Sequence, residues 1–247
     1  INMGKKLDSF ISKLDTLNTT ELVDVFVPSI QKEVPFKLFS VGQQKDLIRT
    51  ALTGIVGAIK CGVIYNDIIT NNCQEDIEFS CEDKNAILIA LRKASISSDI
   101  TIDGINYKLD ELPTKLPKLK NQTKKIKFSD FELSLKVPSL ELDKTITEKA
   151  LLDISKLNEE KKKSESVDIL LTYEIVKYLD SIKGDDNDFD LNELTVYEKK
   201  RVVENLPLKV NNKIMEFIAS VTEYNNQYVT FKDNTVVEFD AGFLTRE

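Results

Sequence analysis

Two glycines near residue 60 have the spacing found in a phosphate-binding loop. Gly57 and Gly62 match that motif, which continues with Lys and then Ser or Thr. Val63 and Ile64 occupy those two positions here, so the ammonium group that would reach the phosphates is missing. We also expect this stretch to end a helix, which would leave no helix N-terminus pointing at an anion. The glycines are therefore interpreted as packing and helix-terminating residues.

A run of acidic residues has the composition of a calcium-binding loop. It contains Asp185, Asp186, Asp188 and Asp190. An EF-hand loop needs Gly at its sixth position and Glu at its twelfth. Counted from Asp185 or from Asp186, neither position holds the required residue. We interpret the run as turn-forming and helix-capping residues, and a looser cation site is the alternative.

The chain contains no histidine, which removes much of the usual catalytic repertoire. Ser-His-Asp and Cys-His nucleophiles and every His-based zinc site are excluded. Three cysteines without a C-x-x-C spacing cannot supply four zinc ligands, so we expect reduced, partly buried thiols at Cys61, Cys73 and Cys81. Two carboxylates could still meet in space, as in a glycoside hydrolase, but no pattern points to such a pair. We therefore expect no catalytic residue, no cofactor and no metal.

The composition is that of a folded protein with an acidic surface. The 247 residues are 41% hydrophobic and 30% charged, and the formal net charge is -7. A general nucleic-acid-binding protein would carry an excess of Lys and Arg, and an acidic surface gives no reason to expect an anionic membrane as partner. The most apolar window, 47–65, is interrupted by Arg49 and Lys60, so we expect no membrane-spanning helix there.

Lysines concentrate in residues 116–127 (LPKLKNQTKKIK). We interpret this segment as a solvated loop and edge strand, because lysines on an edge strand prevent pairing with other chains. Contact with an acidic surface of a partner protein is the functional alternative.

The first 97 residues are expected to form an α+β region. Strands over 22–27 and 34–39 should pair as a hairpin, and Ser40 with Gln43 forms the capping-box pattern that precedes a helix. Apolar residues at helical spacing predict an amphipathic helix near the N-terminus and another helix over 83–94. In the first of these they are Leu7, Phe10, Ile11, Leu14 and Leu17, and in the second Ile87, Leu88, Leu91 and Ala94.

The helix predicted over 43–60 should be the main core element of this region. Its apolar stripe contains Leu47, Ile48, Ala51, Leu52, Ile55, Val56 and Ile59. If this stripe is buried, Leu52→Ala should cost about 2 to 5 kcal/mol.

Residues 98–145 are predicted to form a small antiparallel β unit. Asp103-Gly104 is a type I′ hairpin signal, and strands over 124–128 and 132–137 are joined at Ser129-Asp130. Residues 146–247 are expected to be a helical C-terminal region that ends in a hairpin. Its helices are predicted over 146–157, 169–182, 194–205 and 210–224, with a charged connection at 158–165 and a loop at 184–188. The predicted class is α+β, mostly helical, with short antiparallel hairpins.

The C-terminal hairpin, residues 227–239, is the candidate partner interface. With its turn at Asp233-Asn234, both faces of the hairpin are apolar, so neither is expected to face solvent. A two-stranded hairpin alone is marginal in water, so either the chain's own helices or a neighbouring subunit should cover it. The residues expected at the interface are Tyr228, Val229, Phe231, Val236, Val237, Phe239, Phe243 and Leu244.

Three stretches of sequence are similar to those of a known family. Residues 27–39 (VPSIQKEVPFKLF) with 40–48 (SVGQQKDLI), residues 81–97 (CEDKNAILIALRKASIS) and residues 134–140 (SLKVPSL) resemble the base-plate hub proteins of T-even-type contractile-tailed phages. The first stretch corresponds to that family's opening hairpin and helix, the second to its second helix and the third to its strand followed by Pro. The similarity extends over most of the chain and is strongest over 28–97.

The resemblance implies a structural component or assembly factor of the baseplate hub in a phage tail. It implies other baseplate or tail proteins as partners in an oligomeric assembly, no catalytic residue, and a location in the virion after assembly in the host cytoplasm. A transient tail-assembly chaperone, absent from the virion, is one alternative. A carboxylate-based phage hydrolase is the alternative from another class.

Overall fold

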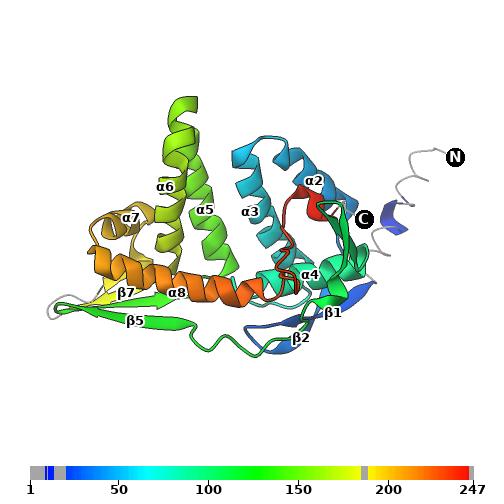
Figure 1. The fold of residues 1–247 in the computed structure, drawn as a ribbon, viewed down its shortest axis with the longest axis horizontal. Coiled ribbons are helices and arrows are strands. Elements are labelled where there is room, and N and C mark those ends of the chain that lie inside the picture. Colours follow the sequence, from blue (N-terminus) through cyan, green and yellow to red (C-terminus); the bar gives the residue numbers. More distant parts are fainter. Residues whose placement is uncertain (1–8, 10, 14–20, 185–188, 245–247) are drawn as a thin grey trace.

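The computed structural model describes residues 9, 11–13, 21–184 and 189–244. Helices and short antiparallel strands form two groups that lie next to each other along the long axis of the molecule (Figure 1). The expected α+β class is confirmed. Of the predicted N-terminal helix, Ser9 and residues 11–13 are helical, while Leu7, Phe10, Leu14 and Leu17 lie outside the described residues. No helix in the described ranges is both long and apolar enough to cross a membrane.

The first group begins with the predicted hairpin. Strands β1 (Leu22–Val27) and β2 (Lys32–Lys37) pair antiparallel. Because side chains alternate along a strand, Val25 and Val27 share the inner face with their neighbours on β2, Val34 and Phe36, and all four are at most 1% exposed.

The helix predicted over 43–60 is interrupted, and this part of the prediction is wrong. Two helices are present, α2 (Val41–Ala51) and α3 (Ile55–Asn72). Gly54, with φ of +75°, lies between them and adopts a backbone conformation that a helix cannot contain. The predicted capping box at Ser40 is confirmed.

Leu52 does not belong to the core, because it follows the last turn of α2 and is 82% exposed. The loss of stability expected for Leu52→Ala therefore has no basis in the packing. Leu47, which is fully buried, takes the role that the sequence pattern gave to Leu52.

Helix α4 (Lys84–Ser95) covers the inner face of the β1–β2 hairpin. Ile87, Leu88 and Leu91 are fully buried as predicted, but Ala94 is exposed because it lies in the last turn of the helix. Strands β3 (Asp99–Ile102) and β4 (Ile105–Lys108) follow, and a short 3-10 turn spans Leu109–Glu111. Asp103 and Gly104 have φ of 51° and 79°, which confirms the predicted type I′ turn.

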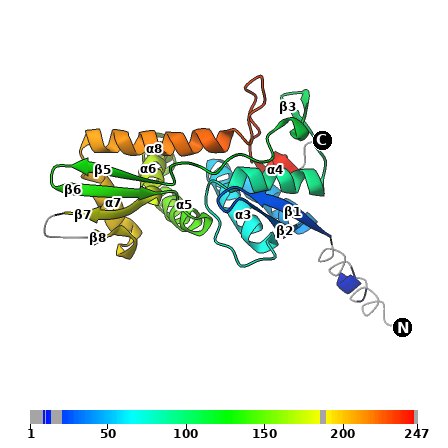
Figure 2. The ribbon, with the colours of Figure 1, turned by 90° about the horizontal axis from the view of Figure 1, so that it is seen from below.

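The second group contains a four-stranded sheet in the order β5-β6-β7-β8 (Figure 2). Its strands are β5 (Thr123–Phe128), β6 (Phe131–Lys136), β7 (Leu179–Lys183) and the short β8 (Phe189–Asp190). The two hairpins of the predicted β unit thus belong to separate sheets. The domain boundaries at residues 97 and 145 stay a prediction.

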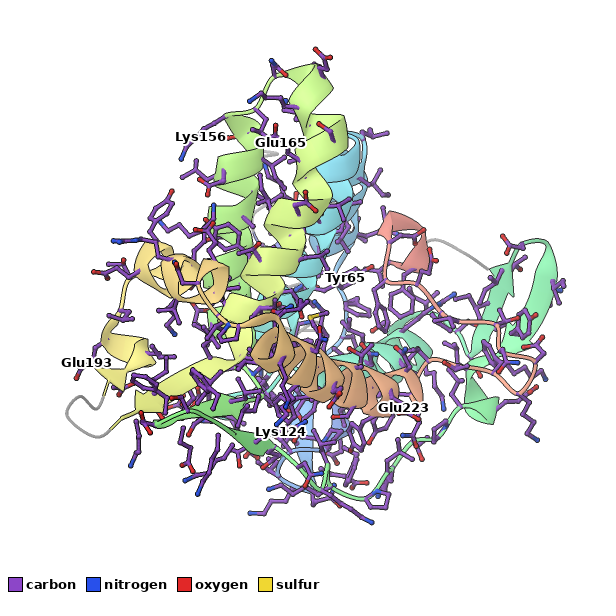
Figure 3. The ribbon with its side chains drawn as sticks, turned by 60° about the vertical axis from the view of Figure 1, so that its left-hand side comes forward. Tyr65, Lys124, Lys156, Glu165, Glu193 and Glu223 are labelled. Carbon is purple, nitrogen blue, oxygen red and sulfur yellow. The ribbon has the colours of Figure 1, made fainter. Side chains whose placement is uncertain are left out.

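Four helices complete this group: α5 (Leu140–Ser155), α6 (Glu159–Tyr178), α7 (Val196–Glu204) and α8 (Leu208–Asn226). A second 3-10 turn, Leu191–Glu193, precedes α7. Helices α5 and α6 rise together away from the sheet (Figure 1), and Lys156 and Glu165 lie near the tip of this helical hairpin (Figure 3).

Two predictions about α6 are wrong. The charged stretch 158–165 is its N-terminal part: Asn158 accepts a hydrogen bond from the backbone NH of Lys161, and acidic residues in the first turn favour a helix start. The helix predicted to reach residue 182 ends at Tyr178, because Leu179 and Ile182 join the sheet beside β6 as part of β7.

Three groups of buried apolar side chains hold these elements together. The first core joins β1, β2, α3 and α4 to the C-terminal segment, which ends in a 3-10 turn, Ala241–Leu244. The second core lies between the β5–β8 sheet and α8, with the end of α6. The third core lies between α5 and α6 and contains Ile146, Ala150, Tyr173 and Val176.

Candidate functional site

A groove with a volume of about 450 Å³ lies where the two groups of elements meet. The β1–β2 turn and the ends of β5, β6 and β7 contribute to its walls. Its charged lining residues are Glu78, Lys118, Lys136, Lys177 and Asp180. Because both signs of charge are present, the groove does not concentrate a field of one sign on a ligand.

Asp83, a fully buried acid, ties the β1–β2 turn to the start of α4. Its carboxylate accepts hydrogen bonds from the backbone NH of Ser29 at 2.7 Å, the Ser29 hydroxyl at 2.8 Å and the backbone NH of Ser80 at 2.8 Å. Burial raises the pKa of Asp83, while these three donors act to lower it. The carboxylate is therefore engaged in holding backbone elements together.

Glu82, the neighbouring acid, is also fully buried. The side-chain amide of Gln122 donates to its Oε1 at 2.5 Å, whereas Oε2 has no hydrogen-bond partner. Burial raises the pKa of Glu82 to about 7; the Gln122 hydrogen bond opposes this shift and Asp83 adds to it. Gln122 ends the segment that connects the first group of elements to β5 in the second group. Glu82 thus contacts this connection between the two groups.

Replacing Glu82 with Gln should flatten the pH dependence of stability. In the wild type the unfolded chain loses the Glu82 proton near pH 4.5 and the folded chain near pH 7, so the free energy of unfolding falls as pH rises through this window. The difference amounts to on the order of 3 kcal/mol. Urea denaturation at several pH values between 4 and 8 measures it. Asp83 is present in both proteins, so its own titration cancels in the comparison. If the free energy of unfolding of the variant changed with pH as steeply as that of the wild type, the raised pKa of Glu82 would be contradicted.

A buried charged network joins α3, α4, α5 and α6. Lys177 contacts Asp143 at 2.8 Å and Glu174 at 2.7 Å, and its side chain is 13% exposed. Asn66 donates to Asp143 at 2.7 Å, and Lys84 donates to the carbonyl of Gly62 at 2.9 Å. Burial alone would raise the pKa of Asp143, but Lys177 and Lys84 lower it.

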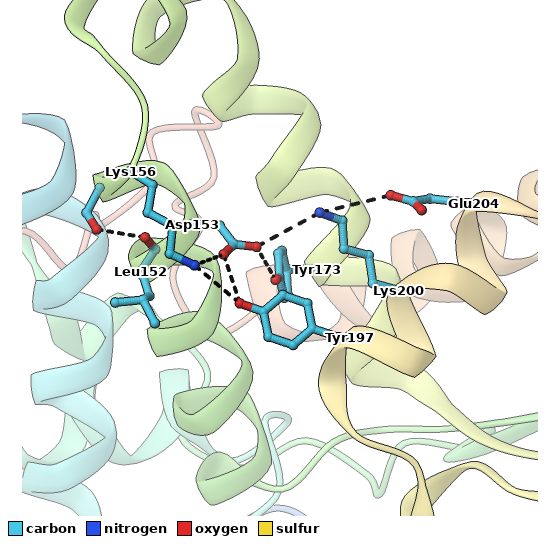
Figure 4. Close-up of polar contacts among 8 residues, drawn as sticks. Leu152, Asp153, Lys156, Tyr173, Tyr197, Lys200 and Glu204 are labelled. Atoms are coloured by element: carbon cyan, nitrogen blue, oxygen red, sulfur yellow. Dashed lines mark hydrogen bonds and ion pairs between the residues drawn. The ribbon is translucent and has the colours of Figure 1, made fainter.

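Asp153 forms a second polar centre, between α5, α6 and α7 (Figure 4). The hydroxyls of Tyr173 and Tyr197 donate to its carboxylate at 2.6 and 3.1 Å, and Lys156 and Lys200 approach it at 3.0 and 3.9 Å. Burial raises the pKa of Tyr173, and the hydrogen bond to Asp153 raises it further. A phenol with a raised pKa is a poor base or nucleophile at neutral pH, so this centre fixes the helices.

The cysteine thiols are not activated as nucleophiles. Burial raises the pKa of Cys61, Cys73 and Cys81 alike, whereas a reactive thiol needs a lowered pKa. All three are free, as predicted. Within the described ranges, no three His, Cys, Asp or Glu side chains are grouped so that they could hold a metal ion.

The glycine pair lies near the start and middle of α3, so the prediction that this stretch ends a helix is wrong. The packing role predicted for these glycines is confirmed at Gly57, where an added Cβ would lie 2.2 Å from the carbonyl oxygen of Thr50. Of the acidic run, Asp185, Asp186 and Asp188 lie outside the described residues, and Asp190 ends β8.

The lysine-rich segment ends in β5, which is an edge of the sheet, and this part of the prediction is confirmed. Lys125 pairs with Glu132 on β6 at 2.7 Å. Lys124, which is labelled in Figure 3, approaches Glu216 on α8 at 3.8 Å. Whether the segment also contacts an acidic partner stays a prediction.

Most residues of the candidate partner interface are buried within the chain's own first core. Tyr228, Val229, Phe231, Val237, Phe243 and Leu244 are each at most 5% exposed, and Phe239 packs against them. Val236 is the exception, at 42% exposed. The structure thus brings seven of the eight together, as an internal contact of the C-terminal segment with α3, α4 and their neighbours.

The C-terminal hairpin differs from the prediction in register. Thr230 faces Val236, and backbone hydrogen bonds join Phe231 to Thr235 and Val237 to Val229, each 2.8 Å long. The predicted register is therefore wrong by one residue, because Asn234, with φ of 69°, belongs to a longer turn. Val237 consequently takes the buried side, together with Val229, and Val236 points outward.

Comparison with known protein families gives a match over most of the chain. The model of a family described as T4 bacteriophage base plate protein matches residues 19–232. The chain belongs to this family. The match covers both groups of elements, from the β1–β2 hairpin to the first half of the C-terminal hairpin, and it confirms the resemblance to phage base plate proteins. No curated protein and no solved structure matches this base plate protein.

The buried polar centres were not predicted, although the sequence contained one signal for them. Lys177 and Arg92 each lie within strongly apolar stretches, and long charged residues are seldom buried unless they are paired. Their partners, the carboxylate of Asp143 and the backbone carbonyl of Asp99, could not be predicted, because they are identified only by the fold.

Proposed function

We propose that this base plate protein is a structural component or assembly factor of the baseplate hub, acts through protein–protein contacts and catalyses no reaction. The observation that carries the proposal is the family match over 19–232, which places the chain among the proteins of the phage tail baseplate. The hub role and the choice of partners go beyond that match.

The state of the polar side chains supports a role without catalysis. Asp83, Asp143 and Asp153 each accept hydrogen bonds that join separate elements, and an acid or base in catalysis must instead reach a substrate. The groove offers charges of both signs, and burial raises the pKa of all three cysteine thiols of the chain. A carboxylate-based hydrolase is therefore the less supported alternative.

Inactivating the gene in the phage tests this proposal. Without the protein, infected cells should accumulate incomplete baseplates, seen by electron microscopy of lysates, and supplying the protein from a plasmid should restore complete tails. If complete tails formed without it and only lysis or wall penetration failed, the hydrolase alternative would be correct.

The exposed edge of the C-terminal hairpin is the part of the candidate interface that is accessible to a partner. Val236 is 42% exposed. Beside the same hairpin, Thr230 and Asn234 line an open, largely apolar depression along α8, together with Met215 and Ala219. We propose that another baseplate or tail protein contacts this surface.

Val236→Asp should abolish that contact without unfolding the chain. A charge at a half-exposed position changes stability by about 0.5 kcal/mol or less, but a charge inside an apolar interface costs several times more. Co-purification of tagged protein with baseplate intermediates measures the contact.

Val237→Asp, one residue further, is the matched control. Val237 is 2% exposed, so this variant should lose its folded structure, as seen by circular dichroism. Normal assembly of the Val236→Asp variant would show that the hairpin edge is not an interface.

A further inference from the structure

Strand β5 has a neighbouring strand on one side only. It is the first strand in the sheet order β5-β6-β7-β8, so β6 pairs with one of its edges and the other edge is open (Figure 2). Directly before β5, the backbone NH of Val137 donates to the carbonyl of Gln122 at 2.9 Å. Because hydrogen-bonded and non-hydrogen-bonded pairs alternate along an antiparallel ladder, this bond determines which β5 residues turn toward β6.

The alternation directs the backbone groups of Thr123, Lys125 and Lys127 to the open edge. Positions 124, 126 and 128 exchange hydrogen bonds with β6 in the observed register. Thr123, Lys125 and Lys127 are all exposed. Within the described ranges, no hydrogen bond from outside the β5–β6 ladder reaches their backbone NH or carbonyl groups. The open edge of β5 therefore offers a row of donors and acceptors with which a further strand can pair.

The charge along this edge has one sign. Residues 116–127 contain five lysines and no acidic residue, in a chain whose formal net charge is -7. Lys118, Lys120 and Lys127 are exposed and form no ion pair with the described residues. Complementary charge steers a partner to a surface and excludes partners of like charge. A segment that pairs with β5 should therefore be acidic.

We propose that an extended acidic segment of another protein binds the open edge of β5 as an added strand. Its backbone exchanges hydrogen bonds with Thr123, Lys125 and Lys127. Residues directly opposite each other on paired strands share a face, so acidic side chains at alternate positions of the segment lie opposite Lys125 and Lys127. The proposal concerns the kind of segment that is bound, and it does not depend on a role in the baseplate hub.

A second copy of the chain is a poor occupant of this edge. Pairing β5 with the β5 strand of another copy would place lysines opposite lysines, which is destabilising. The lysines that prevent such pairing attract an acidic strand. The same side chains thus exclude one partner and admit another.

A fluorescent synthetic peptide of alternating Glu and Val, capped at both ends, tests the proposal on the full-length protein. Fluorescence anisotropy measures binding, and a peptide of alternating Lys and Val is the control. The acidic peptide should bind, and the basic peptide should not. Amide hydrogen exchange followed by NMR should show new protection at Thr123, Lys125 and Lys127 when the acidic peptide is added. Ile126 should change little, because its NH already bonds to β6.

Lys125→Pro and Lys125→Gln are a matched pair of variants. Both remove the ammonium group, but only proline also removes the NH that faces the open edge. An edge strand tolerates proline where the NH faces away from its neighbour, so circular dichroism should show both variants folded. The acidic peptide should bind the Pro variant about tenfold more weakly than the Gln variant, because a backbone hydrogen bond is lost.

Several results would overturn the proposal. These are failure of the acidic peptide to bind, equal binding of the acidic and basic peptides, and equal weakening by the two variants. Equal weakening would mean that the lysines contact an acidic surface without strand pairing. If the Pro variant did not fold, the exchange measurement would decide, and absence of new protection at Thr123, Lys125 and Lys127 would contradict strand addition.

Discussion

Replacing Phe243 with alanine is expected to lower the free energy of unfolding by about 3 to 5 kcal/mol. The Phe243 side chain is fully buried in the first core. Its ring lies 4.8 Å from that of Phe239 and 6.0 Å from that of Tyr65, measured between centroids. The guanidinium group of Arg92 lies over the same ring at 5.6 Å. Urea denaturation followed by circular dichroism measures the loss.

Phe131→Ala is the matched control, because it removes the same side chain from a half-exposed position. Phe131 is 43% exposed, and its ring stacks on the ring of Phe128. Its loss should cost about 1 kcal/mol. If Phe243→Ala were as mild as Phe131→Ala, the C-terminal segment would not be part of the first core, and its residues would be available to a partner.

The second large effect is expected at Lys177, at the centre of the buried network. Lys177→Met keeps the apolar stem but leaves Asp143 buried next to Glu174 without the ammonium group that both contact. Removing one partner of a buried ion pair costs about 3 to 5 kcal/mol. The variant should also lose less of its remaining stability than the wild type loses as pH falls through the titration of Asp143, because Lys177 is one of the groups that keep the folded-state pKa of Asp143 below its usual value.

Lys162→Met on the same helix is the control. Lys162 contacts Glu159 at 2.7 Å with the same three-residue spacing as Lys177 and Glu174, but the Glu159 side chain is 87% exposed. Exposed pairs of this kind contribute about 0.5 kcal/mol. Equal losses for the two variants would mean that the network around Lys177 is open to solvent.

Local signals in the sequence predicted many of the elements. The capping box at Ser40 and the type I′ turn at Asp103-Gly104 depend on neighbouring residues alone, and both are confirmed. The β1–β2 hairpin and α4 follow from side-chain periodicity and are present within two residues of the predicted bounds. These features needed no knowledge of the rest of the chain.

The errors occurred where tertiary contacts or a single backbone angle decide the structure. The apolar stripe over 43–60 continues through Gly54, and its periodicity carries no information about the left-handed φ that separates α2 from α3. The apolar run after 169 fits a helix throughout, but pairing with β6 converts its end into β7. A longer turn at Asn234 shifted the register of the C-terminal hairpin by one residue, so that Val237 shares the buried face with Val229 and Val236 is half-exposed, although both faces were expected to be covered.

The candidate site was harder to predict than the fold. The groove and the buried centres combine residues that are far apart in the chain, as with Ser29 and Asp83 or Asn66 and Asp143. Residue type alone marks such positions as unusual, while the identity of each partner depends on how α3, α4, α5 and α6 pack.

Quantitative mass spectrometry of purified, tail-complete particles tests the central claim most directly. A structural component of the baseplate hub should be present in each particle at a fixed small copy number relative to other tail proteins, and it should remain after the particles are washed in high salt. Recovery of the protein from assembly intermediates in infected cells, together with its absence from finished particles, would contradict the structural role and identify a transient assembly chaperone.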